Sequence, residues 1–127
     1  LVGSEMCIRD RLHIIGLENE CDTLACELSG GQMKLLEIGR LLMLGVKMMM
    51  LDEPIGGVNP VLAHEILSHI QKIRNSLQTS FLIIEHRLDI IMKYVDYVYA
   101  LAEGKVICSG SPSEIVKRKE LYEIYLS

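Results

Sequence analysis

The strongest structural signal in the chain is Leu28-Ser29-Gly30-Gly31-Gln32 with the run that follows it to Gly45. Ser29 and Gln32 form a capping box: the serine hydroxyl can accept from the Gln32 backbone N–H, and the glutamine side chain can accept from the Ser29 N–H. Apolar or small residues then recur at helical spacing, at Leu35, Ile38, Gly39 and Leu42. The pattern predicts an amphipathic helix that begins after Ser29 and stops near Gly45.

Two interpretations fit the start of this helix. In the first, it is the capped end of an ordinary surface helix. In the second, Gly30 and Gly31 leave the backbone N–H groups open to an anion, because glycine has no Cβ and the helix dipole is positive at this end. Motifs further along the chain favour the second interpretation.

Two apolar runs later in the chain are each followed by side chains that can bind a metal ion or transfer a proton. Val46–Leu51 is followed by Asp52 and Glu53, and Phe81–Ile84 leads to His86. Short apolar runs with such boundaries predict buried strands of a parallel α/β sheet, the first of them buried on both faces. Ligands of these folds bind at the carboxyl ends of the strands. A carboxylate there can hold Mg²⁺, a second can orient or deprotonate water, and a histidine can contact a transferred phosphate.

Local signals predict the remaining elements. Asn59-Pro60 supplies an N-cap and a first helical residue for a helix to about Asn75. Glu103-Gly104 predicts a hairpin turn, and Ser111 with Glu114 forms a second capping box. The other expected elements are a helix end over 12–17, strands over 80–85, 97–101 and 105–108, a short helix over 88–94, and a final helical region with Leu121, Ile124 and Tyr125 on its apolar face.

Bulk composition limits the class of protein. The chain has 127 residues, 50% of them hydrophobic, which is enough for one domain with a core. A net charge of −4 indicates neither a nucleic-acid face nor a polybasic membrane patch. No run approaches the roughly 18 apolar residues of a membrane span. The cysteines at 7, 21, 26 and 108 have no zinc-ligand spacing, which favours reduced thiols in a cytosolic setting.

In order and spacing, Ser29–Gln32, Asp52-Glu53 and His86 resemble the signature loop, Walker B strand and switch histidine of ABC-type ATPases. The resemblance covers residues 12–127. It implies an α/β fold: a truncated P-loop NTPase with a mainly parallel sheet flanked by helices. Residues 12–45 would be the end of the helical subdomain that carries the signature motif, 46–111 a partial ATPase core, and 112–127 C-terminal helices. The G-x-x-x-x-G-K-[ST] loop has no counterpart here, so we expect the C-terminal half of such an ATPase.

The resemblance also implies roles for three residues at the strand ends. Asp52 would help to hold Mg²⁺ through water. Glu53 would be the catalytic base that positions the attacking water. His86 would contact the γ-phosphate of ATP.

A second group of residues is expected to act across a head-to-tail dimer of two ATPase subunits. Asn59 stands at the D-loop position, where its N-cap role and its family role coexist. The signature residues would bind the ATP of the opposite subunit: Ser29, Gly30, Gly31 and Gln32.

Four stretches look most like the ATP-binding subunits of branched-chain amino-acid importers: Gly56–Pro60, Ile84–His86, Gly110–Ile115 and Ile124–Leu126. Such a subunit would lie on the cytoplasmic face of the inner membrane, peripheral to its permease partners and without nucleic acid. Lipopolysaccharide-export ATPases share much of the tail. A non-transport ABC ATPase would also fit these motifs, and so would a half-domain that only mediates interactions.

Residues 1–11 resemble a translated sequencing-library adaptor and are expected not to belong to the domain. By the family resemblance, the strand before the phosphate loop would lie between the strand over 81–85 and the hairpin over 97–108. Without it, we expect two separate sheet pieces with exposed edges. The chain alone is expected to be inactive, because it has no phosphate loop.

Overall fold

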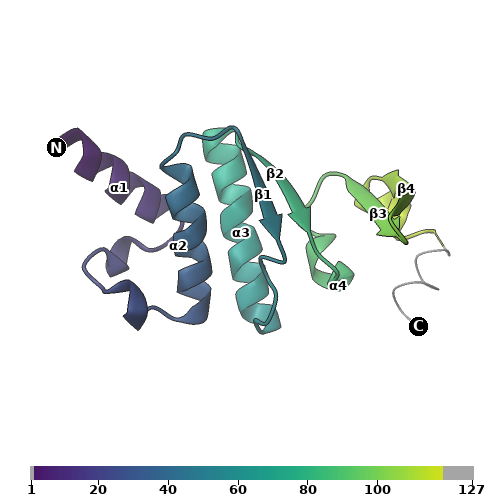
Figure 1. Ribbon diagram of the computed structural model, residues 1–127, viewed down its shortest axis with the longest axis horizontal. Helices are drawn as coiled ribbons and strands as arrows, with labels where there is room; N and C mark the ends of the chain where they lie inside the picture. The colour runs from purple at the N-terminus through teal and green to yellow at the C-terminus, as the bar shows by residue number, and fades with distance from the viewer. Residues whose placement is uncertain (1, 119–127) are drawn as a thin grey trace. The chain divides into compact units, whose positions relative to one another are not determined.

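The computed structural model describes residues 2–118 and divides into two compact units after Arg87 (Figure 1). The apolar face expected at Leu121, Ile124 and Tyr125 lies outside the described residues. None of the helices in the described part of the chain has the length and apolarity that a membrane crossing requires.

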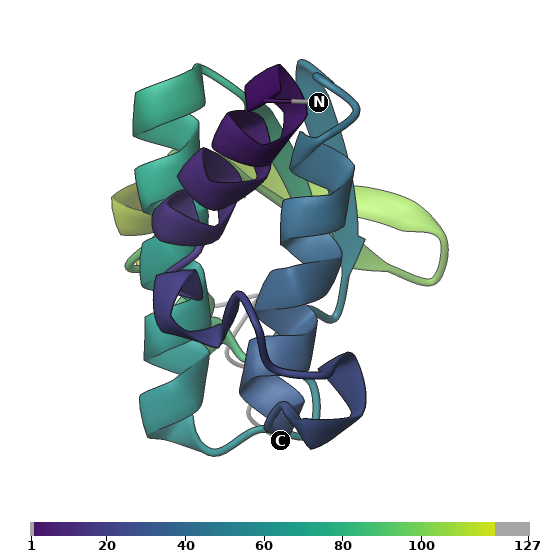
Figure 2. The same cartoon turned by 90° about the vertical axis from the view of Figure 1, so that its left-hand side faces the viewer.

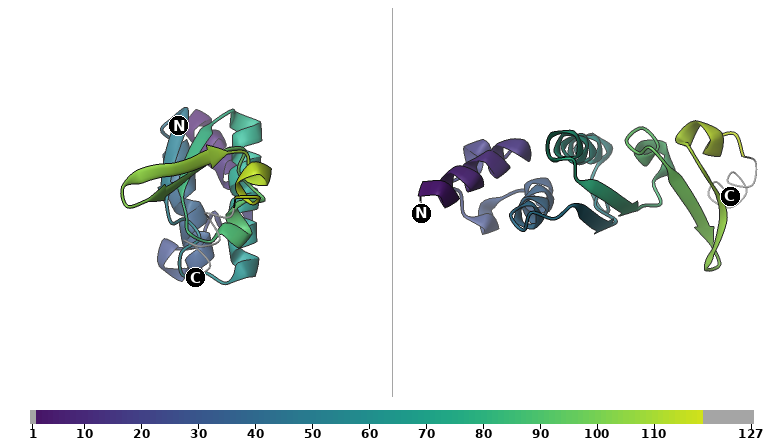
Figure 3. Two further views of the ribbon diagram at one scale, coloured as in Figure 1. Left: turned by 90° about the vertical axis from the view of Figure 1, so that its right-hand side faces the viewer. Right: turned by 90° about the horizontal axis from the view of Figure 1, so that it is seen from above.

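The first unit is a layer of helices beside a two-stranded parallel sheet. Strands β1 (Met48–Asp52) and β2 (Ser80–Ile84) pair in parallel and are connected through helix α3 (Pro60–Leu77). The two helices α2 (Gly30–Leu42) and α3 lie on one side of the sheet (Figures 1 and 3). The other elements of this unit are α1 (Val2–Ile14) and the 3₁₀ turns η1 (Glu18–Glu20) and η2 (Ala25–Glu27).

The predicted capping box of α2 is confirmed. Gln32 N donates to Ser29 Oγ at 3.3 Å, and Ser29 N donates to Gln32 Oε1 at 2.9 Å. The helix ends at Leu42, before Gly45, which has a positive φ of 64°. The cap of α3 is confirmed as well, because Leu62 N donates to Asn59 Oδ1 at 2.9 Å.

The core of this unit lies where the helices face one another and the sheet. Helices α1, α2 and α3 contact each other pairwise. Each large apolar side chain buried there contributes about 1.5–3 kcal/mol relative to an exposed one. The buried apolar residues of the unit are Ile15, Leu17, Leu35, Ile38, Leu42, Met49, Ile55, Ala63, Ile66, Leu67, Ile70 and Ile73.

The prediction that the first strand is buried on both faces is wrong. Met49 is 3% exposed, whereas Met48 and Met50 on the other face are 54% and 70% exposed. Leu82 and Ile84 on β2 are exposed in the same way. The physical reason is that α2 and α3 cover one face of this sheet, so successive side chains alternate between buried and exposed.

The second unit is an antiparallel hairpin with short helices. Its elements are α4 (Leu88–Ile91), β3 (Val98–Ala102), β4 (Lys105–Gly110) and α5 (Pro112–Ile115), so α4 is shorter than expected. Glu103 and Gly104 both have positive φ, at 49° and 74°, which confirms the predicted hairpin turn. Ala100, Cys108 and Ile115 form its buried cluster.

The second capping box is present at the start of α5. The Glu114 carboxylate accepts from the Ser111 hydroxyl at 2.7 Å and from the Ser111 N–H at 2.8 Å. These hydrogen bonds to Ser111 lower the pKa of Glu114, because they favour its charged form.

The described strands form two separate ladders, β1–β2 and β3–β4, and no ladder joins β2 to the hairpin within the described residues. The sequence predicted this division. It leaves edge N–H and C=O groups that strand pairing does not satisfy.

Candidate functional site

The parallel register of β1 and β2 brings two predicted site residues, Glu53 and His86, close to each other. Asp52 lies opposite Ile84, and Glu53 N continues the ladder by donating to Ile84 O at 3.0 Å. Just beyond these strand ends, His86 Nδ1 lies 3.2 Å from Glu53 Oε1. Both side chains are exposed, so a carboxylate and an imidazole are presented together at the carboxyl end of the sheet.

Glu53 has an unusual backbone conformation. Its φ of 45° lies in the left-handed region, which few non-glycine residues adopt. Gly56 N donates to Glu53 O at 2.9 Å and closes a tight turn around it. Such conformations cost about 1–3 kcal/mol and concentrate at functional sites. Gln78 at the end of α3 and Glu103 in the hairpin turn have similar φ values, so the turn fits a role for Glu53 in the site without showing one.

Asp52 fits a magnesium site that is completed by other groups. Its exposed carboxylate ends β1 beside a hollow of about 190 Å³ between that strand and α2. Among the described residues there is no group of three or more His, Cys, Asp or Glu side chains that could hold a metal. Mg²⁺ commonly keeps several waters and binds one or two carboxylates plus phosphate oxygens. A single carboxylate at this place suits that kind of coordination.

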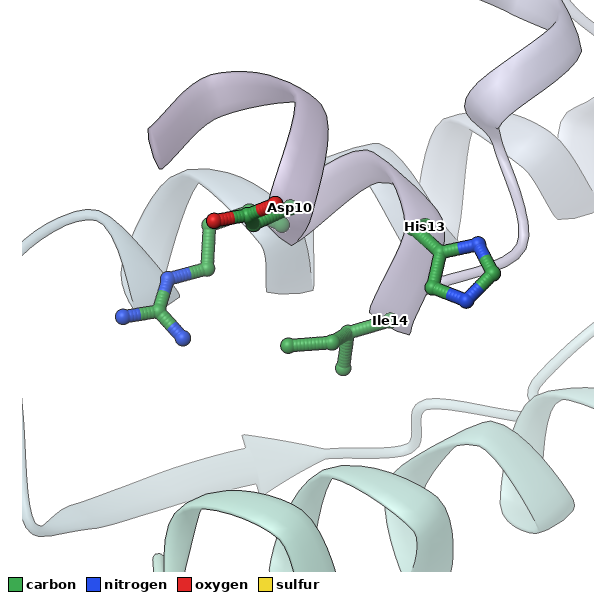
Figure 4. Close-up of a pocket in the computed structure, with 4 residues that line it drawn as sticks. Asp10, His13 and Ile14 are labelled. Carbon is green, nitrogen blue, oxygen red and sulfur yellow. The ribbon is translucent and has the colours of Figure 1, made fainter. Parts of the chain in front are cut away.

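The larger hollow, of about 350 Å³, lies on α1 and contains none of the predicted site residues (Figure 4). It is lined by Asp10, Arg11, His13 and Ile14.

The two signature glycines differ in what they contact. A Cβ at Gly30 would meet nothing within 4 Å, so this position is open. A Cβ at Gly31 would come within 2.4 Å of Leu62 Cδ1, so here glycine lets α2 pack closely against α3. Gly31 therefore also serves the close packing of α2 on α3, and the interpretation that both glycines serve anion approach stays a prediction. The first turn of α2 has no acidic residue, which suits an anion.

The side chain of Gln32 is fixed from two sides. Its Oε1 accepts from Ser29, and its Nε2 donates to Glu20 Oε1 at 3.1 Å. Glu20, on η1, also accepts from Thr23 Oγ1 at 2.8 Å. Sequence reasoning missed Glu20, because no spacing rule links residues 12 positions apart in a loop and a helix.

The predicted site residues fall into two groups at one end of the first unit. Glu53 and His86 interact directly, with Asp52 beside them. The signature residues start α2, and Asn59 starts α3; both helices rise from the same end (Figure 2).

Replacing Gly31 by alanine should destabilise the first unit by about 1–3 kcal/mol, the usual cost of overpacking. The reason is the contact that the new methyl group would make with Leu62. Urea unfolding measures the effect. Gly30→Ala is the matched control and should change stability by less than about 0.5 kcal/mol. A Leu62→Ala background should remove most of the difference between the two variants. Equal effects of both alanines would contradict the packing role.

Comparison with solved structures identifies the fold. The ADP conformation of an ATP-binding cassette of an ABC transporter matches with a TM-score of 0.85 and 42% identity, over 94% of this chain and 48% of that one. The cbiO1 protein of Clostridium perfringens, from the transporter complex cbiONQ, matches with a TM-score of 0.86 and 31% identity, over 94% of this chain and 48% of that one. The fold is that of the ABC ATPase cassette, a P-loop NTPase-like α/β fold, as the sequence predicted.

Sequence comparison shows which ABC transporter proteins this chain is similar to. The ABC transporter family profile matches residues 6–56. The probable branched-chain amino acid transport ATP-binding protein LivG of Methanocaldococcus jannaschii is 45% identical over 119 residues, 91% of this chain and 46% of that protein. The LivG-type protein of Archaeoglobus fulgidus is 44% identical over 115 residues, 91% of this chain and 44% of that protein. The energy-coupling factor transporter ATP-binding protein EcfA2 of Streptococcus pyogenes is 35% identical over 121 residues, 94% of this chain and 43% of that protein.

The chain spans about half the length of the curated relatives that it matches. Within that span its sequence is similar to those of ABC transporter ATP-binding proteins, with 44–45% identity to the two LivG-type relatives.

Proposed function

We propose that this chain supplies the hydrolytic half of an ATP-hydrolysing subunit of an ABC transporter. The observation that supports this most directly is the Glu53–His86 pair, 3.2 Å apart at the ends of adjacent parallel strands. Asp52 precedes the pair at the end of β1. A phosphate-transferring site needs these parts: a place for Mg²⁺, a base for water and a group that contacts the transferred phosphate.

In this proposal Glu53 positions the attacking water and accepts its proton at a carboxylate oxygen. His86, in contact with that carboxylate, donates a hydrogen bond toward the γ-phosphate. Asp52 holds Mg²⁺ through water, and the bound ion would neutralise charge on the phosphate oxygens. The tight turn at Glu53 keeps its carboxylate at the strand end while the phosphate approaches.

The signature residues bind the ATP of the opposite subunit in a head-to-tail dimer. The Ser29 hydroxyl accepts from Gln32 N, which leaves its own O–H to donate to a phosphate oxygen. Gly30 and Gly31 contribute backbone N–H groups, and Gln32 holds the cap in place. Asn59, at the start of α3, takes the D-loop role at the same interface.

The transported substrate we propose is a branched-chain amino acid. Support comes from the 44–45% identity to LivG-type proteins, against 35% to EcfA2. The partners are then a second ATPase subunit and transmembrane permease subunits, with the ATPase peripheral on the cytoplasmic face of the inner membrane. Lipopolysaccharide export and a non-transport ATPase are the competing outcomes of the test.

The test uses an ATPase subunit in which a half with a phosphate loop is placed before this chain, and we call this subunit the full-length protein. Phosphate release should require both ATP and Mg²⁺. Membrane vesicles that contain its permease subunits should take up leucine only when ATP is supplied. Absence of Mg²⁺-dependent hydrolysis would contradict the ATPase proposal, and hydrolysis without leucine uptake would contradict the substrate. The 127-residue chain alone should show no turnover.

A further inference from the structure

Two hydrogen bonds outside the predicted site join the segment after β2 to the loop after β1. Ile55 N donates to Glu85 Oε1 at 3.0 Å. Arg87 Nη1 donates to Val58 O at 3.0 Å. Glu85 and Arg87 are half-buried and stand on either side of the exposed His86. We call this pair of hydrogen bonds the clasp.

One bond of the clasp satisfies a buried backbone N–H, and the other gives a backbone carbonyl a charged donor. Ile55 is fully buried, and a buried backbone N–H needs an acceptor. Glu85 supplies one from outside the loop. The Arg87 guanidinium gives Val58 O a charge-assisted donor, which is stronger than a neutral one.

The position of the clasp connects it to the proposed chemistry. The loop that it holds begins with Glu53 and its left-handed backbone, and it ends at Asn59, the N-cap of α3. The segment that holds it carries His86, whose Nδ1 lies 3.2 Å from Glu53 Oε1. A shift of the loop along the 85–87 segment would therefore break the clasp and change the Glu53–His86 distance together.

We propose that Glu85 and Arg87 are positioning residues: they fix the loop of Glu53 and Asn59 against His86, and they act through those residues without touching ATP. This inference rests on the proposed ATPase function. It adds a coupling between the hydrolytic pair and Asn59 at the subunit interface. Errors of about 1 Å in such positions can cost about 10²-fold in rate.

Glu85 offers a variant that separates hydrogen bonding from charge. Oε1 makes the bond to Ile55, while the buried Oε2 has no hydrogen-bond partner among the described residues. Glu85→Gln keeps an acceptor for Ile55 N–H and removes the charge. Glu85→Leu removes the acceptor at similar size.

The first measurement is steady-state ATP hydrolysis by the full-length protein. Glu85→Leu should lower kcat about 10–100-fold, with KM for ATP changed by less than about threefold, because the chemical step loses its geometry and the ATP contacts stay. Glu85→Gln should stay within about threefold of the parent in both constants. Glu65→Leu, at an exposed glutamate of α3, is the control for a surface replacement. A kcat for Glu85→Leu equal to that of Glu65→Leu would overturn the proposal, and so would equal losses in the Gln and Leu variants.

The second measurement is amide hydrogen exchange, which does not depend on ATP turnover. Arg87→Met and Glu85→Leu should each speed exchange of residues 53–59 and leave α2 and α3 as protected as in the parent. Faster exchange throughout the unit would show a general stability role and overturn the proposal; unchanged exchange in 53–59 would overturn it too. The two proposals can fail separately. If the parent does not hydrolyse ATP, the proposed ATPase function is wrong. If exchange of residues 53–59 is nevertheless faster in the Glu85 and Arg87 variants, these two residues still hold the loop in position.

Discussion

Replacing Glu53 by glutamine in the full-length protein should remove most ATP hydrolysis and leave ATP binding intact. Glutamine has the same shape, and its Oε1 can keep the 3.2 Å contact with His86 Nδ1. It cannot take a proton from water at neutral pH, and loss of a general base typically costs about 10²–10⁴-fold in rate. Phosphate release under saturating ATP and Mg²⁺ measures the loss, and nucleotide binding at equilibrium measures what is kept.

A dimer that binds ATP and cannot hydrolyse it should accumulate in this variant. Size-exclusion chromatography with ATP and Mg²⁺ should therefore show a larger dimer fraction for Glu53→Gln than for the parent. Glu65→Gln makes the same chemical change at an exposed position of α3 and should behave as the parent. Hydrolysis by Glu53→Gln within about tenfold of the parent would remove Glu53 from the role of base, since general-base loss costs more than that.

Local signals predicted the parts of this fold that depend on neighbours in sequence. The capping box at Ser29, the N-cap at Asn59 and the turn at Glu103 each depend on hydrogen bonds or φ values within a few residues. These local features need no knowledge of the tertiary structure. The Glu53–His86 contact was not predicted, because it also requires that β1 and β2 be neighbours in the sheet, so that both strands end at the same edge.

Features that depend on distant parts of the chain were not predictable. Gly31 is explained by Leu62 on another helix, and Gln32 is held by Glu20 on a 3₁₀ turn. An apolar run such as Met48–Leu51 does not reveal whether helices cover one face of the strand or both. In each case the feature depends on a contact between residues whose spacing in the sequence matches neither the repeat of a helix nor that of a strand.

The sharpest test of the signature residues separates their role in the fold from the role that we propose for them at the ATP of the opposite subunit. Ser29 caps α2, so Ser29→Ala would lose about 0.5–2 kcal/mol whatever else the residue does. Ser29→Asn and Ser29→Asp both keep a capping side chain, because Asn and Asp cap helices about as well as Ser. Only the aspartate adds a negative charge, which repels a phosphate at the helix start. Ser29→Asp is therefore the lesion and Ser29→Asn its control.

Mixed dimers of the full-length protein then show where Ser29 acts. One dimer carries Ser29→Asp in one subunit and a phosphate-loop lesion in its partner; the other carries both lesions in the same subunit. In a head-to-tail arrangement, each ATP lies between the phosphate loop of one subunit and the signature residues of the other. The first dimer then keeps one intact site and should hydrolyse ATP, while the second keeps none and should be inactive. The reverse result would place Ser29 at the ATP of its own subunit, and equal rates in the two dimers would remove it from the ATP site altogether.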